Sequence, residues 1–258
     1  MPACPACDES VPDVRYCPFC GTELTPAPTE RGPIAYAFAY PLDRNWQPIS
    51  FTALFLLFGF LLFPLVYVAG YAYRIGRAAV RNDPVPPSFG AAAGISRDGA
   101  LVILTVVPFV LLVCGAVLTP VVIAAQLDVW ALTLLATPML LIGGYVTGSL
   151  YATFLATGSV TATYRGFRFL TFARTRAYFT AVLLLVGIGL LVGTLVFVTG
   201  LIVFVSIPAV FVFLPVYLVV GAFMAYVPSV LLAYYYRAAA EEGDVPPPLE
   251  PQRLEVAY

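Results

Sequence analysis

Four long stretches of this chain contain no acidic or basic residue: Phe51–Tyr73, Gly99–Leu127, Val129–Tyr164 and Ala177–Tyr236. A helix needs about 20 apolar residues to cross a bilayer, so each stretch can hold at least one span. None shows the two-residue alternation of a barrel strand, and a helix satisfies its own backbone polar groups in lipid. The sequence therefore predicts an all-α integral membrane protein that passes several times through the cell membrane.

About five transmembrane helices fit these stretches if the last stretch divides in two. They form a predicted membrane domain at residues 51–236. The predicted spans are Phe51–Tyr73, Ala100–Gln126, Val129–Thr157, Ala177–Thr199 and Ala209–Tyr236. Residues 26–50 form a predicted Pro-rich linker with an interfacial stretch at Ile34–Tyr40. Residues 237–258 form an acidic, Pro-rich tail that we expect to be disordered.

The N-terminal residues 1–25 contain four cysteines in two Cys-x-x-Cys steps, Cys4-Pro-Ala-Cys7 and Cys17-Pro-Phe-Cys20. Each step can present two thiolates to one metal ion, so the pair predicts a four-sulfur, tetrahedral zinc ribbon. This segment has too few apolar residues for a core of its own. Zinc binding, worth about 10–16 kcal/mol in comparable peptides, would stabilise its fold. Iron also accepts four thiolates, and two disulfides are the alternative in an oxidising compartment.

The charge of the predicted ribbon bears on its partner. Residues 1–25 hold four acidic residues and a single arginine, whereas a nucleic-acid-binding ribbon needs a basic surface. A thioredoxin-like redox role would need a βαβ unit, which this sequence does not predict. We therefore expect no nucleic-acid partner and interpret the ribbon as a docking module for an unidentified protein.

All of the basic residues are arginines, and two groups of them flank predicted spans. Arg74, Arg77 and Arg81 have the spacing of one helix face. We interpret both groups as contacts to anionic lipid headgroups of the bilayer, with simple anchoring at the membrane surface as the alternative. The candidate residues are Arg74, Arg77, Arg81, Arg165, Arg168, Arg174 and Arg176.

The arginines also predict an orientation, which conflicts with the zinc ribbon. Five spans place both arginine groups and the tail on one side, and the positive-inside rule makes that side cytoplasmic. The ribbon would then lie outside, although a reduced zinc–thiolate site belongs in the cytoplasm. An additional or re-entrant segment would be needed to satisfy both rules.

Small residues recur at four-residue intervals in two predicted spans. These candidate packing positions are Gly144, Gly148, Ala152, Ala156, Gly189 and Gly193. Such positions allow close approach of helices in lipid. They predict either packing within the chain or a seam between copies in a homo-oligomer.

Few residues here could perform catalysis. The chain has no histidine, the commonest general base, and no ionisable residue lies inside a predicted span. Cys114 has no base beside it and is interpreted as a small apolar filler. We therefore predict a non-enzymatic membrane scaffold or adaptor whose ribbon and tail dock other proteins. The alternative is a permease-like carrier for small apolar or lipid-like molecules, using the Pro-kinked spans.

Several short motifs resemble the membrane family catalogued as domain of unknown function 4013. They are Tyr40-Pro-Leu, Gly70-Tyr71-x-x-Arg74, Pro86-Pro87-Ser88-Phe89, Asp98-Gly99 and Ala156-Thr157-Gly158-Ser159. The resemblance implies a multi-pass archaeal or bacterial protein, in many cases from halophiles, and it implies no catalytic residue because the family carries no established activity. Separately, residues 1–21 resemble the zinc ribbons fused to many prokaryotic membrane proteins, although Asp8 follows Cys7 where those ribbons have glycine.

Overall fold

The computed structural model describes residues 32–43, 46–58, 62–83, 86–87, 92–127, 129–205 and 207–249. About 89% of this part of the chain is helical and no strand occurs in it, so the predicted all-α class is confirmed there. Two predicted features lie outside the described residues. They are the ribbon with Cys4, Cys7, Cys17 and Cys20, and residues 250–258 of the tail.

The described elements follow one another with short connections. In chain order they are α1 (Pro33–Ala39), the 3₁₀ turn η2 (Tyr40–Leu42), α2 (Gln47–Leu57), α3 (Leu62–Val80), α4 (Ala92–Leu127), the 3₁₀ turn η3 (Trp130–Leu135), α5 (Ala136–Thr157), α6 (Val160–Tyr164), the 3₁₀ turn η4 (Arg165–Phe167), α7 (Arg168–Ala173), α8 (Arg176–Val205) and α9 (Ile207–Glu241).

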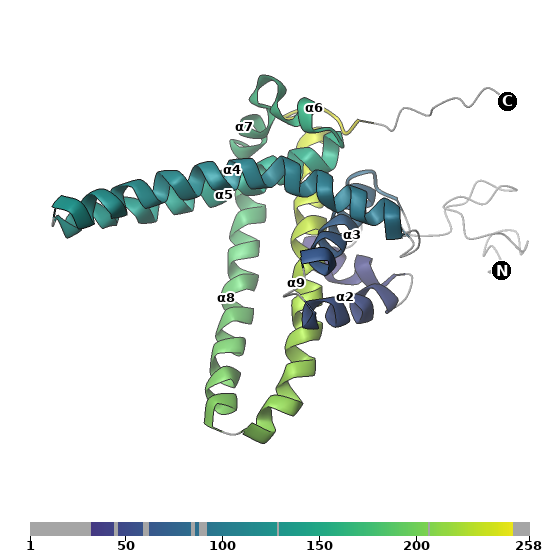
Figure 1. Ribbon diagram of the computed structural model, residues 1–258. Helices are drawn as coiled ribbons and strands as arrows, with labels where there is room; N and C mark the ends of the chain where they lie inside the picture. The colour runs from purple at the N-terminus through teal and green to yellow at the C-terminus, as the bar shows by residue number, and fades with distance from the viewer. Residues whose placement is uncertain are drawn as a thin grey trace, which may run out of the picture.

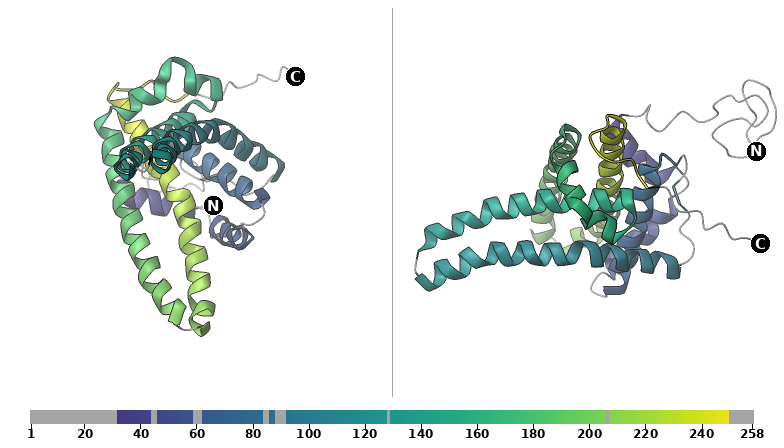
Figure 2. Two further views of the ribbon diagram at one scale, coloured as in Figure 1. Left: turned by 60° about the vertical axis from the view of Figure 1, so that its left-hand side comes forward. Right: turned by 90° about the horizontal axis from the view of Figure 1, so that it is seen from above.

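Two long helical hairpins project from a common core. Helices α4 and α5 run side by side as one hairpin, and α8 and α9 form the other (Figure 1). The two hairpins leave the core in different directions (Figures 1 and 2). The short helices α1, α2 and α3 lie at the base of the hairpins, where they pack against α9.

Four helices in the described part of the chain are long and apolar enough to cross a membrane. They are Gly94–Leu127, Thr133–Thr157, Arg176–Leu201 and Phe213–Glu241. Each overlaps one of the predicted spans. The predicted first span, Phe51–Tyr73, is not among them, because it is divided between α2 and α3. From Tyr67 onward α3 is mostly buried in protein, with Tyr71, Ile75 and Ala79 fully buried, whereas Phe63 near its start is 65% exposed. A run without charges cannot distinguish a helix surrounded by protein from one surrounded by lipid.

The outer parts of both hairpins present apolar surface. Only 6% of the most apolar window of the α4 span, and 6% of that of the α8 span, is buried inside the protein, against 44% for the α5 and α9 spans. Leu111, Leu112, Leu190 and Leu191 are each about two-thirds exposed or more. Contiguous apolar surface of this extent marks contact with lipid or with another protein.

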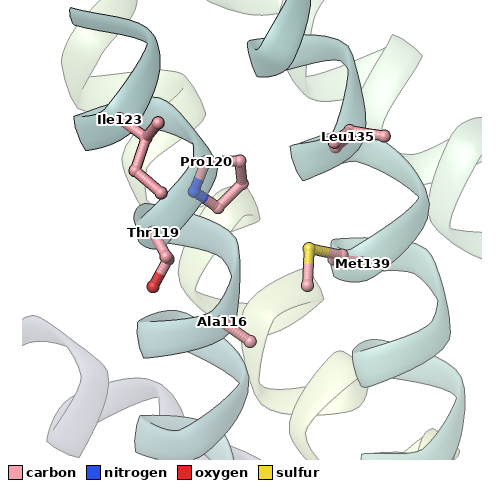
Figure 3. Close-up of a pocket in the computed structure, with 6 residues that line it drawn as sticks. All are labelled: Ala116, Thr119, Pro120, Ile123, Leu135 and Met139. Atoms are coloured by element: carbon pink, nitrogen blue, oxygen red, sulfur yellow. The ribbon is translucent and has the colours of Figure 1, made fainter. Parts of the chain in front are cut away.

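An apolar pocket of about 360 Å³ lies between α4 and the segment formed by η3 and the start of α5. Its lining residues face one another across the two helices (Figure 3). They are Ala116, Thr119, Pro120, Ile123, Leu135 and Met139. The Thr119 hydroxyl donates to the Gly115 carbonyl (2.8 Å), so its hydrogen-bond donor is already satisfied within α4.

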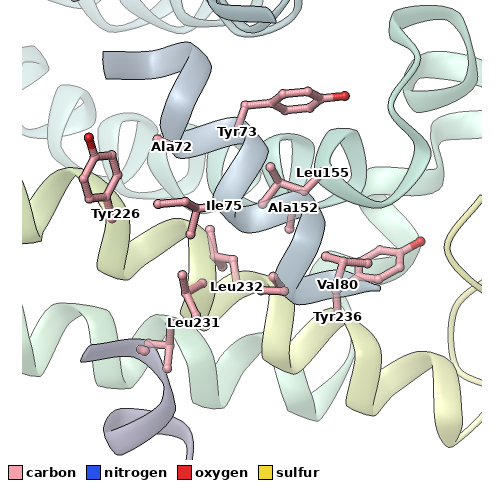
Figure 4. Packing of buried hydrophobic residues seen from close by; sticks show 14 of the residues in the cluster. Ala72, Tyr73, Ile75, Val80, Ala152, Leu155, Tyr226, Leu231, Leu232 and Tyr236 are labelled. Carbon is pink, nitrogen blue, oxygen red and sulfur yellow. The ribbon is translucent and has the colours of Figure 1, made fainter. Parts of the chain in front are cut away.

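The core forms where α3 meets the C-terminal halves of α5 and α9. Ile75, Leu155 and Leu231 come from these three helices and are fully buried together (Figure 4). Aromatic rings pack around them: Tyr73 stacks on Phe154 with 5.0 Å between ring centroids. Large buried side chains such as these dominate the packing energy of a core.

Two regions near the chain ends differ from their sequence prediction. The predicted interfacial stretch Ile34–Tyr40 falls on α1 and η2, where Tyr36 is fully buried against α9. The predicted tail begins inside α9, and residues up to Leu249 return to the core. Val245 is buried, and the Leu249 amide donates to the Ala156 carbonyl (3.1 Å).

Candidate functional site at the junction of α3, α4 and α5

The site depends on a close crossing of α3 and α4 at two glycines. A Cβ atom on Gly70 would lie 2.7 Å from the backbone nitrogen of Gly99 and closer still to the Ile95 carbonyl oxygen. A Cβ atom on Gly99 would lie 2.8 Å from the Val66 carbonyl carbon. Real Cβ atoms do not approach this closely, so only glycine allows the two backbones to touch.

The crossing aligns polar side chains on either side of it. Arg74 Nε donates to Asp98 Oδ2 at 2.5 Å, and both side chains are about one-quarter exposed. On the same helix, the Tyr71 hydroxyl donates to the Pro87 carbonyl (3.0 Å). These two contacts tie α3 to α4 and to the segment between them.

The side chain of Arg77, in the last turn of α3, reaches the C-terminal end of α5. Its guanidinium lies against the backbone of Gly158, where a Cβ atom would overlap it. Gly158 ends α5 in the left-handed conformation (φ +64°), which glycine adopts without strain. The position also suits a cation, because a helix C-terminus carries partial negative charge. Arg77 Nη1 donates to the Tyr73 hydroxyl (2.9 Å), whereas its Nε is buried without a hydrogen-bond partner in the described structure.

These residues surround a polar pocket of about 220 Å³. It is lined by Tyr73, Arg74, Arg77, Ala78, Arg81, Asp83, Pro87 and Asp98. Burial, and then repulsion from Arg77, lower the pKa of Arg81 below its ordinary value. Burial raises the pKa of Asp83, an effect that Arg81 partly offsets. The pocket therefore holds like charges close together in a partly desolvated place.

The four other arginines predicted to contact lipid do not line this pocket. Arg165, Arg174 and Arg176 are exposed on the segment that joins α5 to α8, and Arg168 is half-buried there, near Tyr236. They lie on the same side of the candidate spans as the pocket.

The predicted small-residue positions have two different environments. Gly148 faces the Tyr178 hydroxyl, where a Cβ atom would lie 2.7 Å from its oxygen, and Ala152 and Ala156 are buried in the core. Gly144, Gly189 and Gly193 have no atom within 4 Å of the place where a Cβ would lie. The first group packs within the chain, whereas the second leaves open surface on the hairpins.

A second polar cluster fixes the end of α3 to α9. Arg237 is almost fully buried and donates from Nη1 to Asn82 Oδ1 (2.6 Å) and to the Ala79 carbonyl (3.4 Å). Asn82 has a positive φ of 60°, a conformation that asparagine tolerates better than most residues. Because Arg237 has these partners and lies over the Tyr234 ring, it acts as a structural clamp.

Sequence reasoning identified Arg74, Arg77 and Arg81. It missed the other parts of the site, which are Tyr73, Gly70, Asp98, Gly99 and Gly158. A signal was available, since most of these residues belong to the motifs that carry the family resemblance. Motifs far apart in the sequence meet here: Gly70 with Gly99, Arg74 with Asp98, and Tyr71 with Pro87.

Three arginines and two carboxyl groups line this pocket. Within the described ranges, no three His, Cys, Asp or Glu side chains are close enough to hold a metal ion. The chain matches no protein-family model, no curated protein and no solved structure.

Proposed function

We propose that this protein is a membrane-embedded scaffold, with a helical platform at one membrane surface that docks other proteins through the zinc ribbon and the tail. The observation that supports this proposal most directly is the distribution of the arginines relative to the four candidate spans. With four spans, ten of the 13 arginines lie outside the spans, on the side that also holds residues 1–93 and 242–258, and Arg97, Arg176 and Arg237 lie in the span ends nearest that side. The two connections on the opposite side, residues 128–132 and 202–212, contain a single charged residue, Asp128.

The four-span arrangement removes the orientation conflict. The positive-inside rule assigns the arginine-bearing side to the cytoplasm, because the connections on the other side contain no arginine. An even number of spans puts the ribbon on that side as well, where thiolates stay reduced and can hold zinc. The ribbon, the polar pocket and the tail then face the same compartment.

The divergence of the hairpins bears on how they enter lipid. Both can cross one flat bilayer only if they turn toward each other about the core. The core residues are shared by α3, α5 and α9, whereas the outer halves of the hairpins are held mainly by their own pairing. We therefore expect the core to stay fixed and the hairpins to reorient.

Thiol labelling in intact cells tests this topology. In a Cys114→Ser background, single cysteines at Leu134 and Phe211, both exposed near the hairpin tips, should react with an impermeant maleimide. The ribbon cysteines, freed by a chelator, should react only after lysis. Labelling of the ribbon in intact cells, or of only one hairpin tip, would contradict the four-span arrangement.

A site-specific photo-crosslinker tests the docking role. Placed at Phe19 in the ribbon, it should give adducts with discrete proteins in cells, and these adducts should disappear when Cys20 is changed to Ser. The same crosslinker at Leu191, on the lipid-facing surface of α8, is the control. Adducts that do not depend on Cys20 would refute docking through a folded ribbon.

A lipid-like carrier is the second candidate, and the apolar pocket between α4 and α5 favours it. Its volume and apolar lining suit part of an acyl chain. Met139→Trp should fill this pocket, whereas Leu140→Trp on the same helix faces outward. Uptake of an apolar or lipid-like solute into vesicles that Met139→Trp abolishes and Leu140→Trp preserves would support this role.

A further inference from the structure

We propose that the polar pocket at the α3–α4 crossing binds a phosphate group, carried either by an anionic lipid or by a small phosphorylated solute. This site goes beyond the scaffold role and does not depend on it. Arg77, Arg81 and Tyr73 would bind the phosphate, and Asp83 lies beside them in the pocket.

The pocket has positive charge that the described residues do not neutralise. Arg74 is paired with Asp98 at 2.5 Å. Neither Arg77 nor Arg81 forms an ion pair with any acidic residue that the structure describes. Arg77 lies in the last turn of α3, Arg81 directly follows that helix, and both are partly buried. A bound anion would relieve their mutual repulsion and compensate for their desolvation.

The pocket also has hydrogen-bond donors without an acceptor. Arg77 Nε is buried and unpartnered in the described structure, which is rare for a polar atom in a native protein. Tyr73 accepts from Arg77 through its oxygen, so its own hydroxyl hydrogen remains able to donate. Guanidinium groups bind the oxygens of a phosphate in pairs, so both arginines suit this ligand.

The size and position of the pocket agree with this ligand. A volume of about 220 Å³ accommodates a phosphate group and a few waters, at roughly 30 Å³ per water. Gly158 holds the Arg77 guanidinium in place from behind. The pocket lies on the arginine-bearing side of the candidate spans, where both lipid headgroups and soluble phosphates are accessible.

Changes at Asp83 and at Arg81 should shift the affinity for phosphate in opposite directions. The Asp83 carboxylate lines the same pocket and would repel a bound phosphate. Removing this charge should therefore strengthen phosphate binding, whereas removing Arg81 should weaken it. A purely structural role for these residues predicts no such opposite effects.

The experiment uses the full chain purified in a maltoside detergent, which contains no phosphate. The dissociation constant for inorganic phosphate is measured by calorimetry at constant ionic strength. We expect Arg81→Gln to weaken binding by at least about tenfold, as loss of a charge-assisted hydrogen bond does. Asp83→Asn should tighten it, and Arg165→Gln, outside the pocket, should leave it unchanged.

A second arm distinguishes the two sources of phosphate. A short-chain phosphatidylglycerol is titrated in the same way. Binding of inorganic phosphate with the expected variant pattern supports a soluble phosphate ligand, and binding of the lipid alone with that pattern supports a headgroup. The proposal is overturned if wild-type protein binds neither, or if Arg81→Gln binds as tightly as wild type. Asp83→Asn keeps the test decisive if Arg81→Gln fails to fold, because weaker binding in Asp83→Asn also overturns it.

Discussion

Changing Gly99 to alanine should separate α3 from α4 and destabilise the protein. The new Cβ would lie 2.8 Å from the Val66 carbonyl carbon and 3.0 Å from Val66 Cγ1. The helices must move apart by roughly 1 Å before these contacts become acceptable, and such overpacking typically costs about 1–3 kcal/mol. The same movement stretches the Arg74–Asp98 ion pair, which is next to the crossing.

Gly115 offers a matched control in the same helix. It has no atom within 4 Å of the place where a Cβ would lie. Alanine gains about 0.5–1 kcal/mol of helix propensity at either position. The difference in unfolding free energy between Gly99→Ala and Gly115→Ala therefore isolates the crossing, and we expect it to be about 1–3 kcal/mol.

Thermal unfolding in detergent micelles, followed by loss of far-ultraviolet circular dichroism, measures this difference. We expect the Tm of Gly99→Ala to lie roughly 2–12 °C below that of Gly115→Ala. Gly70→Ala should behave as Gly99→Ala does, and the double variant should cost less than the two added, because both contact the same crossing. Equal melting temperatures for Gly99→Ala and Gly115→Ala would refute the crossing.

Three further predictions concern the rest of the chain. Gly158→Ala should lower the Tm more than Gly166→Ala, because both glycines have a positive φ (about 1–2 kcal/mol for alanine) but only Gly158 contacts Arg77. Equal losses would show that the Arg77 contact contributes nothing. Cys20→Ser should lose bound zinc in metal analysis yet remain inserted in the membrane, whereas Cys114→Ser should keep its zinc. Finally, burial raises the pKa of Tyr36 from 10.0 to about 12, so the folded protein keeps a proton that the unfolded chain releases between these values. Stability from this group is complete below pH 10 and is lost as the pH rises toward 12. Tyr36→Phe should therefore lose less stability than wild type between pH 9 and 11 in denaturant titrations, and identical losses would contradict the assignment.

The sequence predicted the helical class and four of the spans because lipid imposes a simple rule on composition. An apolar run of sufficient length is visible without any knowledge of tertiary contacts, as in Ala100–Gln126 and Ala177–Thr199. The predicted first span, Phe51–Tyr73, is not among the candidate spans, because its assignment depends on tertiary contacts. Most apolar residues of α3 from Tyr67 onward face other helices. Nothing local distinguishes a tyrosine such as Tyr71 buried in protein from one at the lipid interface.

The candidate site was predictable only in part. The spacing of Arg74, Arg77 and Arg81 identified a common face, because helical periodicity is a local property. The partners of that face come from elsewhere in the chain, as Asp98 and Gly158 do. The predicted small-residue grooves show the same limit, since Gly148 meets a tyrosine whereas Gly189 meets nothing in the described structure.

The packing of α9 against α1, α2 and α3 has a consequence for biosynthesis. Among the described helices α9 is synthesised last, yet it packs against α1, α2 and α3. At about 5–20 residues per second, these helices must wait on the order of ten seconds for their partner. During that interval Tyr36, Tyr71 and Ile75 lack the part of their core that α9 supplies. A nascent chain that stops before α9 would leave this surface of α1, α2 and α3 uncovered.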